Sequence, residues 1–548
     1  MNLLFRHILK NRPNILFIVA DQLKASALNI YNELGIETPS IEKLYRDGVM
    51  FDNAITPHPL CVPARTSMMT GRYPHSTGCR LNQTLMPPKS NHLFKILKNE
   101  DYVTGLIGKN HCFVEEEDLD LFDVRCEISH RGLPTEENLG ENVGNKGMEW
   151  VVDEEKINIA NRTRNNMKRH RKSPRIAYAS TNYSLEHYSS SLISKQSIEF
   201  LKNYKTGEYN KNSKKPNPFS LLVSFPDPHE PYETPDIYKK MFPPEQIQLP
   251  PQRYDEFSDG TAPERNRVLA EILRHDKDEE IYIRSLISTY FAMIKFIDDS
   301  IGKILDAMDQ FDLRKNTIII FTSDHGDFMG EHGMSVKGGV FYDCLVKVPL
   351  VISWLDGGFA KGTKDESMVN TVDILPTLLN FLSIKSIPSE FENGNYENLD
   401  FLQGDLLPTV TDSKPRYAAF SEYGAGGEAF TMEKLNKMNR PFGYNTLIDT
   451  LWARESEGRR KMVRTKKWKY ITDPLAEGST LNSGSDGGPG NIDELYDLEN
   501  DPWELYNIAH LGEHTEIITE LRRLLLNWMI NTEDNNPIKL SSRLGPTN

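Results

Sequence analysis

The chain has 548 residues and a formal net charge of −14, with 64 basic and 78 acidic side chains. This length allows one large domain with a smaller one beside it. The acidic balance argues against a general nucleic-acid or membrane-surface binder, although it allows a locally positive site for an anionic substrate. No apolar run approaches the length of a transmembrane helix.

The N-terminal stretch has no visible signal peptide. Between Met1 and Arg12 the only apolar run is Leu3–Phe5, which is too short for the apolar region of a leader. As it stands the chain is expected in the cytoplasm, and in the periplasm or outside the cell if a leader has been removed. The cysteines are scattered and odd in number, so they do not indicate a disulfide framework; they are Cys61, Cys79, Cys112, Cys126 and Cys344.

Apolar runs alternate with helical patterns along most of the chain. The run Asn14–Ala20 is typical of a strand buried on both faces of a parallel sheet, and Asp21 follows it directly. Thr38-Pro39 and Gly48 bracket a helix that ends at Asp47. The next predicted elements are a helix from Cys61, a helix at 94–100, strands at 103–108 and 218–225, a helix at 281–308, strands at 316–323 and 348–354, and a helix at 368–384.

Strands that alternate with helices predict an α/β fold with crossover connections. Polar residues stand directly after three of the predicted strands, namely Asp21, His229 and Asp324. Ligands of open α/β sheets bind beyond the carboxyl ends of the strands. We therefore expect the active site at this edge, completed by the helix that starts at Cys61.

The pattern changes after about Lys414 to short strands at 416–423 and 462–471 and a terminal helix at 513–530. It predicts a smaller α+β subdomain on an antiparallel sheet, so the chain divides into a catalytic domain at 1–413 and a subdomain at 414–548. Loops are predicted at 205–218 and 478–490. The basic run 161–175 is either a solvated surface loop or a lip that attracts a polyanionic substrate.

Cys61 lies in an unusual setting, Cys61-x-Pro63-x-Arg65 followed by Thr-Gly-Arg at 70–72. A lone cysteine is usually a small buried hydrophobe. This pattern, however, resembles the signature of type I sulfatases of the alkaline phosphatase superfamily. The resemblance implies that a formylglycine-generating enzyme or an anaerobic sulfatase-maturating enzyme converts Cys61 to formylglycine (3-oxoalanine). It also implies a large, mainly parallel sheet flanked by helices, with a smaller C-terminal subdomain.

The same resemblance implies one divalent metal ion. Hydrolysis of a sulfate ester needs an activated nucleophile and positive charge around the transferring group, and a divalent cation supplies both. The implied ligands are Asp21, Gln22, Asp324, His325 and the modified Cys61. Calcium is expected. Many sulfatases have Asp-Asp where this chain has Asp21-Gln22, and Asn where it has His325. Because this chain offers an amide and an imidazole instead, manganese and magnesium stay open as alternative metals.

Further motifs match the catalytic residues of the family. Gly108-Lys109-Asn110-His111 resembles its Gly-Lys-x-His, in which Lys109 would hold the nucleophile and the sulfate and His111 would accept the proton that releases sulfate. His229 and Lys337 match the residues that stabilise and protonate the leaving oxygen. Arg65 would support the hydrate and the carboxylates through its planar fork of donors. The implied reaction is a double displacement.

The resemblance spans nearly the whole chain and implies a sulfuric ester hydrolase, a sulfatase acting on the sulfate monoester of a carbohydrate or another small organic molecule. Candidate substrate-binding residues are Arg80, Asn82 and Gln83, which follow the Cys61 helix, with Arg464 or Glu422 from the smaller subdomain. No nucleic acid or membrane partner is expected.

Three alternatives stay open. Phosphonate monoester and phosphodiester hydrolases share the fold and the formylglycine, and they also tend to carry Asp-Gln and Asp-His metal pairs. A non-catalytic protein that only binds anions would need an unconverted Cys61 or a broken metal site. A cysteine-thiolate hydrolase is the third alternative, although no acid–His–Cys order stands out.

Overall fold

The computed structural model describes residues 12–128, 166–174, 176–182, 184–210, 217–388, 396–428, 430–442, 458–473 and 493–533. Its centre is an eight-stranded sheet in the order β11-β2-β10-β9-β1-β7-β3-β4. Strand β10 is antiparallel to both of its neighbours and the other pairs are parallel, which confirms the predicted fold class. The strands are β1 (Asn14–Ala20), β2 (Gly48–Ile55), β3 (Val103–Gly108), β4 (Val124–Glu127), β7 (Phe219–Phe225), β9 (Thr317–Ser323), β10 (Leu350–Ser353) and β11 (Thr363–Asn370).

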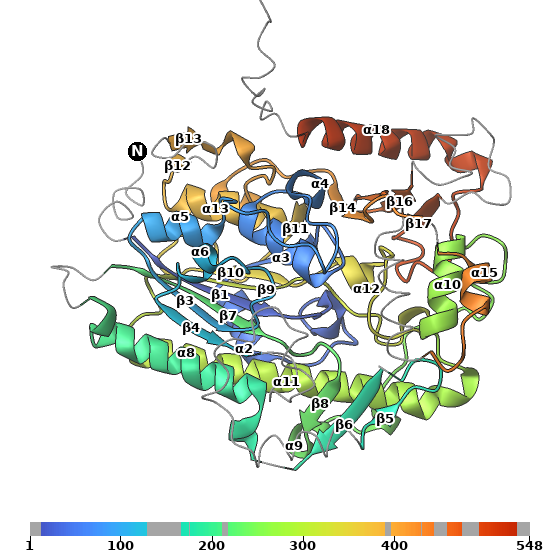
Figure 1. The fold of residues 1–548 in the computed structure, drawn as a ribbon, viewed down its shortest axis with the longest axis horizontal. Helices are drawn as coiled ribbons and strands as arrows, with labels where there is room; N and C mark the ends of the chain where they lie inside the picture. Colours follow the sequence, from blue (N-terminus) through green and yellow to red (C-terminus); the bar gives the residue numbers. More distant parts are fainter. Residues whose placement is uncertain are drawn as a thin grey trace, which may run out of the picture.

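The central strand β1 contributes to two hydrophobic cores, because successive side chains of a strand point to opposite faces. Ile18 packs in the core under α2 (Pro39–Arg46), α8 (Ser189–Lys205) and α11 (Glu280–Gln310). Phe17 packs in the core under α3 (Cys61–Thr70), α5 (Leu93–Asn99) and α13 (Ile374–Phe381). Figure 1 shows α8 and α11 on one side of the sheet and α3, α5 and α13 on the other. Burial of each such side chain stabilises the fold by about 1.5–3 kcal/mol.

A smaller antiparallel sheet lies beside the large one, as the sequence predicts (Figure 1). Its strands, in spatial order, are β14 (Ala419–Tyr423), β15 (Arg460–Arg464), β16 (Trp468–Thr472) and β17 (Glu494–Asp497). Helix α18 (Thr515–Asn531) covers this sheet through Leu521 and Trp528, and Trp528 stacks on Phe420 at a centroid distance of 4.9 Å.

Short elements complete the described parts. A third sheet contains β5 (Lys168–Arg169), β6 (Ala177–Thr181) and β8 (Tyr232–Pro235), and β12 (Ser386–Pro388) pairs with β13 (Tyr396–Asn398). The shorter helices are α4 (Pro74–Thr77), α6 (Glu116–Leu119), α9 (Asp236–Lys239), α10 (Glu264–Leu273), α12 (Asp343–Val346), α14 (Pro408–Thr411) and α15 (Met432–Asn436). None of the described helices is long and apolar enough to cross a membrane.

Several element predictions were wrong in detail. Residues 368–370 end strand β11, and a capping box at Asn370 starts a turn that leads into α13, so the predicted helix at 368–384 is shorter. The predicted strand 462–471 is the hairpin β15–β16, closed where the Thr465 amide donates to the Trp468 carbonyl at 2.8 Å. Helix α2 ends at Arg46 with Asp47 as its C-cap, close to the predicted end, and Gly48 just past it also begins strand β2. Strands β2 and β11 and helix α8 were not predicted.

The described part of the basic run has a structural role. Arg171 lies 2.7 Å from Asp278 and 3.2 Å from Glu279, and Lys172 lies 2.7 Å from Asp276. These residues therefore join two segments of the domain, which disfavours the open, polyanion-attracting lip. The rest of the run, at 161–165 and 175, lies outside the described residues, as do the predicted loop 478–490 and the middle of 205–218. The five cysteines are buried and form no disulfide.

Candidate active site

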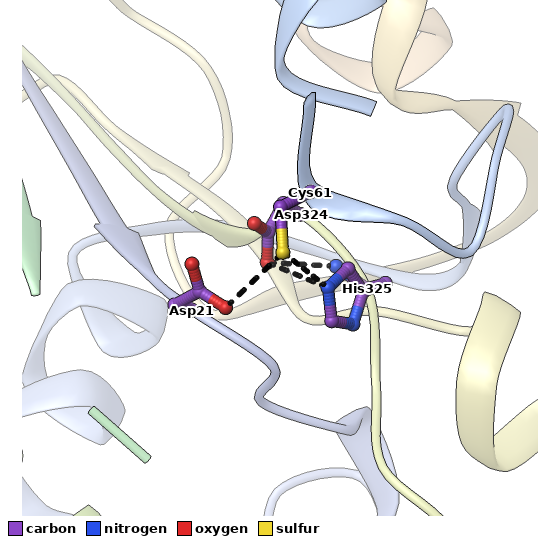
Figure 2. A group of neighbouring side chains, drawn as sticks. All are labelled: Asp21, Cys61, Asp324 and His325. Atoms are coloured by element: carbon purple, nitrogen blue, oxygen red, sulfur yellow. Dashed lines mark hydrogen bonds and ion pairs between the residues drawn. The ribbon is translucent and has the colours of Figure 1, made fainter. Parts of the chain in front are cut away.

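Four buried side chains from three separate segments meet at the carboxyl edge of the large sheet. Asp21 follows β1, and Asp324 and His325 follow the neighbouring strand β9. Their ligand atoms and Cys61 Sγ all lie within 4.8 Å of one another. Figure 2 shows these side chains grouped around a common centre. The structure thus brings together four of the five predicted metal ligands.

Cys61 is the first residue of α3, and every residue of this helix is buried. The Val62 amide donates to Asn82 Oδ1 at 3.2 Å, which satisfies one of the unpaired donors of the first turn. The helix ends at Gly71, whose φ of +65° and proximity to Leu402 exclude a side chain. The Cys61-x-Pro-x-Arg motif and the start of its Thr-Gly-Arg tail therefore form one short helix. The N-terminus of this helix, where the helix dipole is positive, lies at the site.

Cations and imidazoles surround the Cys61 sulfur. Sγ lies 3.4 Å from Lys337 Nζ and 3.1 Å from His325 Nε2, and His111 also hydrogen-bonds it. Burial alone would raise the pKa of the thiol. The positive charges of Lys337, Lys109 and His325 outweigh burial and hold this pKa well below its ordinary value. An anionic oxygen at this position would find the same stabilisation.

Arg65 joins the two carboxylates of the centre. Its Nε lies 2.8 Å from Asp324 Oδ2 and its Nη2 lies 3.0 Å from Asp21 Oδ2, while Nη1 donates to Ser224 Oγ at 2.9 Å. All three charged side chains are at most 3% exposed. The guanidinium fork offsets part of the cost of burying two neighbouring carboxylates.

The Gly-Lys-x-His segment begins at the end of β3. Gly108 has a φ of +101°, and a Cβ there would lie 2.0 Å from the Ser224 carbonyl oxygen, so only glycine fits. The close approach places the Lys109 ammonium against Asp21, with which it forms an ion pair. Burial and the Cys61 charge would raise the pKa of Asp21, but Lys109, His229 and Arg65 together hold it below its ordinary value.

His229 and Lys337 form a pair beside the nucleophile position. Lys337 Nζ lies 2.7 Å from His229 Nε2. The other ring nitrogen, His229 Nδ1, lies 2.6 Å from the Glu230 carbonyl oxygen, so we assign the ring proton to Nδ1 and the lone pair to Nε2. Lys337 then donates to His229, and either side chain can pass a proton to an oxygen that leaves from this side.

The donor set fits a divalent cation. Two buried carboxylates supply oxygen ligands. The Nδ1 of His325 lies 3.0 Å from the Gly326 carbonyl, which orients the ring with Nε2 toward the centre, where it would give up its proton to bind a metal ion. The fifth predicted ligand, Gln22, is engaged differently: its Oε1 accepts from Lys337 Nζ at 2.7 Å.

Some residues near the site were not identified from the sequence. Gln22 Nε2 donates to Glu230 Oε2 at 3.2 Å and to Asp327, and Tyr232 donates to Asp327 at 2.6 Å. The only available signal was position, because Asp327 closes the Asp-His-Gly-Asp segment and Glu230 follows His229. Together with Ser224, these residues fix the amide of Gln22 and the guanidinium of Arg65.

The proposed substrate-binding residues have different environments. Asn82 caps α3, Gln83 is exposed, and Arg80 lies half-buried with Nη1 3.4 Å from the Gly424 carbonyl. Arg464, suggested as a pocket residue from the smaller subdomain, is 5% exposed and binds Asp343. Glu422, the other suggestion from the smaller subdomain, is buried against Lys461 and His75.

Comparisons with known proteins agree with this geometry. The family model described as Sulfatase matches residues 13–384. An ulvan-active sulfatase of Formosa agariphila is 29% identical over 393 residues, which cover 71% of this chain and 65% of that protein. The structure of BT4656 with its substrate D-glucosamine-2-N,6-O-disulfate aligns over 97% of this chain and 100% of that one, with a TM-score of 0.65 and 20% identity. A phosphonate monoester hydrolase of Agrobacterium radiobacter aligns over 97% and 99%, with a TM-score of 0.67 and 21% identity.

Proposed function

The chain belongs to the sulfatase family and is a sulfuric ester hydrolase, and on this premise we propose that it cleaves the sulfate monoester of a saccharide through a formylglycine made from Cys61. One observation carries the proposal: Lys337 and His325 lie 3.4 Å and 3.1 Å from Cys61 Sγ, at the buried N-terminus of α3. A sulfuryl group at this point would meet positive charge on several sides.

In this proposal the Cys61 sulfur marks the position of the formylglycine oxygens. The formylglycine supplies a hydrate hydroxyl as the nucleophile, and a divalent cation held by Asp21, Asp324 and His325 supplies Lewis-acid stabilisation. Lys109 and Lys337 hold the charged oxygens of the sulfuryl group. His111 hydrogen-bonds residue 61 and accepts a proton there.

The leaving group departs on the side of His229. Because Lys337 Nζ donates to His229 Nε2 over 2.7 Å, the pair shares one positive charge and at least one transferable proton. The departing alkoxide takes this proton. Glu230 keeps the His229 ring in place through its carbonyl oxygen, 2.6 Å from Nδ1.

A sulfated saccharide is the proposed substrate class. The ulvan-active sulfatase and the glucosamine disulfate complex support it, because both act on or bind sulfated saccharides. Calcium is the proposed metal, with manganese or magnesium as alternatives. Maturation requires a formylglycine-generating or anaerobic sulfatase-maturating enzyme as a transient partner.

Phosphonate monoester hydrolysis is the second candidate. The Asp21-Gln22 and Asp324-His325 pairs and the fold similarity to a phosphonate monoester hydrolase favour it. The deciding experiment is the ratio of kcat/KM for an aryl sulfate and an aryl phosphonate monoester, with protein matured by a formylglycine-generating enzyme and Cys61→Ala as the blank. A strong sulfate preference that the variant loses supports the sulfatase. A preference for the phosphonate supports the second candidate function, in which the same residues have the same roles.

A further inference from the structure

We infer that the substrate carries a second anionic group, a sulfate or a carboxylate, bound by a subsite that consists of Arg80, Arg459 and the segment Gly424–Gly427. This inference rests on the proposed function, because it names the substrate that the same active site would select. It follows from two arginine side chains at the junction between the subdomain and the large domain. No carboxylate in the described residues lies within hydrogen-bond distance of either guanidinium group.

Arg80 is the centre of this subsite. Its side chain is 18% exposed, and its Nη1 makes one long contact of 3.4 Å with the Gly424 carbonyl oxygen. The nearest carboxylate is Glu422, at 3.6 Å, which is beyond a normal hydrogen bond. Most of the five N–H donors of this guanidinium are therefore available to a ligand.

Glu422 is already engaged by other partners. Its Oε1 accepts from the His75 amide at 2.7 Å and lies 2.8 Å from His75 Nδ1, and its Oε2 forms an ion pair with Lys461. Burial would raise the pKa of this carboxyl, but Lys461, His75 and Arg80 hold it well below its ordinary value. Glu422 thus forms its hydrogen bonds with Lys461 and His75, and its longer ion pair with Arg80, at 3.6 Å, leaves N–H donors of the guanidinium for a ligand.

Arg459 approaches the same backbone segment. A Cβ added at Gly426 would lie 3.1 Å from Arg459 Nε, and Gly424 and Gly426 both have positive φ, +92° and +91°. These glycines let the chain pass close to both guanidinium groups. The Arg459 side chain is exposed, and among the described residues it forms no ion pair; its backbone amide donates to Asp473 at 3.1 Å.

The acidic neighbours of the subsite are buried or paired with a lysine. Glu428 is 94% exposed and faces Lys434 at 3.5 Å. Glu422 and Asp473 are buried, whereas the two guanidinium groups reach solvent. A ligand at this place can therefore reach both guanidinium groups, and planar guanidinium groups suit the two oxygens of a carboxylate or a sulfate.

The subsite lies next to the reaction centre. Asn82, two residues after Arg80, binds the first turn of α3 through the Val62 amide, directly beside Cys61. His58, three residues before Cys61, stacks on Tyr423 at a centroid distance of 5.0 Å, which brings the start of the Gly424–Gly427 segment to the same place. Direct contacts therefore join both the Arg80 segment and the Gly424–Gly427 segment to the residues that flank Cys61.

The test compares four substrates: an aryl sulfate, a hexose monosulfate, the corresponding hexose disulfate and a sulfated hexuronate. We expect the wild type to prefer the disulfate or the hexuronate to the monosulfate by at least tenfold in kcat/KM. Arg80→Ala should lower kcat/KM for the preferred substrate about tenfold more than for the aryl sulfate, and Arg80→Lys should fall between. Arg459→Ala should act in the same direction. Arg440→Ala, an exposed arginine on the same subdomain paired with Glu271, serves as the matched control.

The disulfate and hexuronate arms distinguish the two kinds of anion. Equal kcat/KM for the monosulfate and both dianionic substrates in the wild type would overturn the inference. An equal loss of kcat/KM on all substrates in Arg459→Ala would also overturn it. This variant decides the question if Arg80→Ala fails to fold. Absence of aryl sulfate hydrolysis by the matured wild type would instead overturn the proposed function, and the two failures are therefore distinct.

Discussion

Lys337 Nζ lies 3.4 Å from Cys61 Sγ, although the two residues are 276 positions apart in the chain. The same ammonium contacts His229 and Gln22, each at 2.7 Å. It therefore connects the nucleophile position, the proton donor on the leaving-group side and the metal side of the centre. No single segment of the sequence contains this arrangement, and the predictions below test it.

Replacement of Lys337 should slow cleavage most for poor leaving groups. Lys337→Ala removes the charge beside the sulfuryl group and the hydrogen bond to His229, so kcat should fall at least about 100-fold. The fall should grow as the pKa of the leaving phenol rises in a series of aryl sulfates, because such leaving groups depend most on a proton. Lys434→Ala, an exposed lysine on α15, is the control. A uniform loss across the series would contradict a role in leaving-group departure.

Loss of Arg65 should destabilise the fold and weaken metal binding together. Without the guanidinium, buried Asp324 loses its arginine partner and Asp21 keeps only Lys109, which costs about 3–5 kcal/mol. Arg65→Ala should therefore lower Tm, and added calcium should restore part of the loss. Arg65→Lys keeps the charge without the fork and should be intermediate. Thermal unfolding with and without calcium measures this, and an unchanged Tm in Arg65→Ala would contradict it.

The imidazole of His325 should decide which metal is preferred. A nitrogen ligand suits transition ions, whereas an amide oxygen suits calcium. Removal of the metal with a chelator should abolish activity, and readdition of calcium, magnesium or manganese in turn should restore it to different degrees. His325→Asn should shift the order of metal preference toward calcium, and metal titration of the apoenzyme measures this order. The same order in both proteins would argue against His325 as a ligand.

Asp227 should make stability depend on pH. Burial raises the pKa of its carboxyl from 3.8 to about 7, and the carboxyl lies 3.0 Å from Ser190 Oγ. The folded state therefore holds this proton more tightly than the unfolded state, so the free energy of unfolding should fall as pH rises from about 4 to about 7. Asp227→Asn should flatten this part of the profile. Denaturant unfolding at several pH values tests it, with Asp255→Asn, an exposed carboxyl, as the control.

Arg464 should affect stability and not specificity. Its guanidinium binds Asp343 over 2.7 Å and 2.9 Å, and Lys469 reaches the same carboxylate at 2.6 Å, so the group joins the subdomain to the large domain. Arg464→Met leaves Asp343 paired with Lys469 only and should lower the free energy of unfolding by about 1.5–3 kcal/mol. The relative kcat/KM values of two sulfated substrates should stay the same, and a change in their ratio would place Arg464 in the pocket.

The sequence was most informative where one local pattern decides the structure. Strand β1 is apolar from Ile15 to Ala20, and its ends were predicted as observed. Strand β11 was missed because Thr363–Ser367 is polar at the edge of the sheet, where only a neighbouring strand shows that it pairs. The hairpin β15–β16 was read as one strand because its turn at 465–467 contains neither glycine nor proline.

The site shows the same limit. The motifs of Cys61 and Asp324 are local, so their types and order were readable from the sequence. The environment of Arg464 and the engagement of Gln22 by Lys337 depend on contacts across 121 and 315 positions, which no local pattern contains. Prediction from the sequence therefore reached the reacting groups and Arg65, and it missed long-range contacts such as those of Gln22 and Arg464.

The most direct test of the account measures residue 61 itself. Protein expressed with graded amounts of a formylglycine-generating enzyme gives samples in which peptide mass spectrometry reports the fraction of aldehyde at position 61. The account predicts that aryl sulfatase kcat per mole of protein rises in proportion to this fraction and extrapolates to zero at zero conversion. Full activity in samples that contain only the unmodified thiol would contradict it and point to a thiolate mechanism.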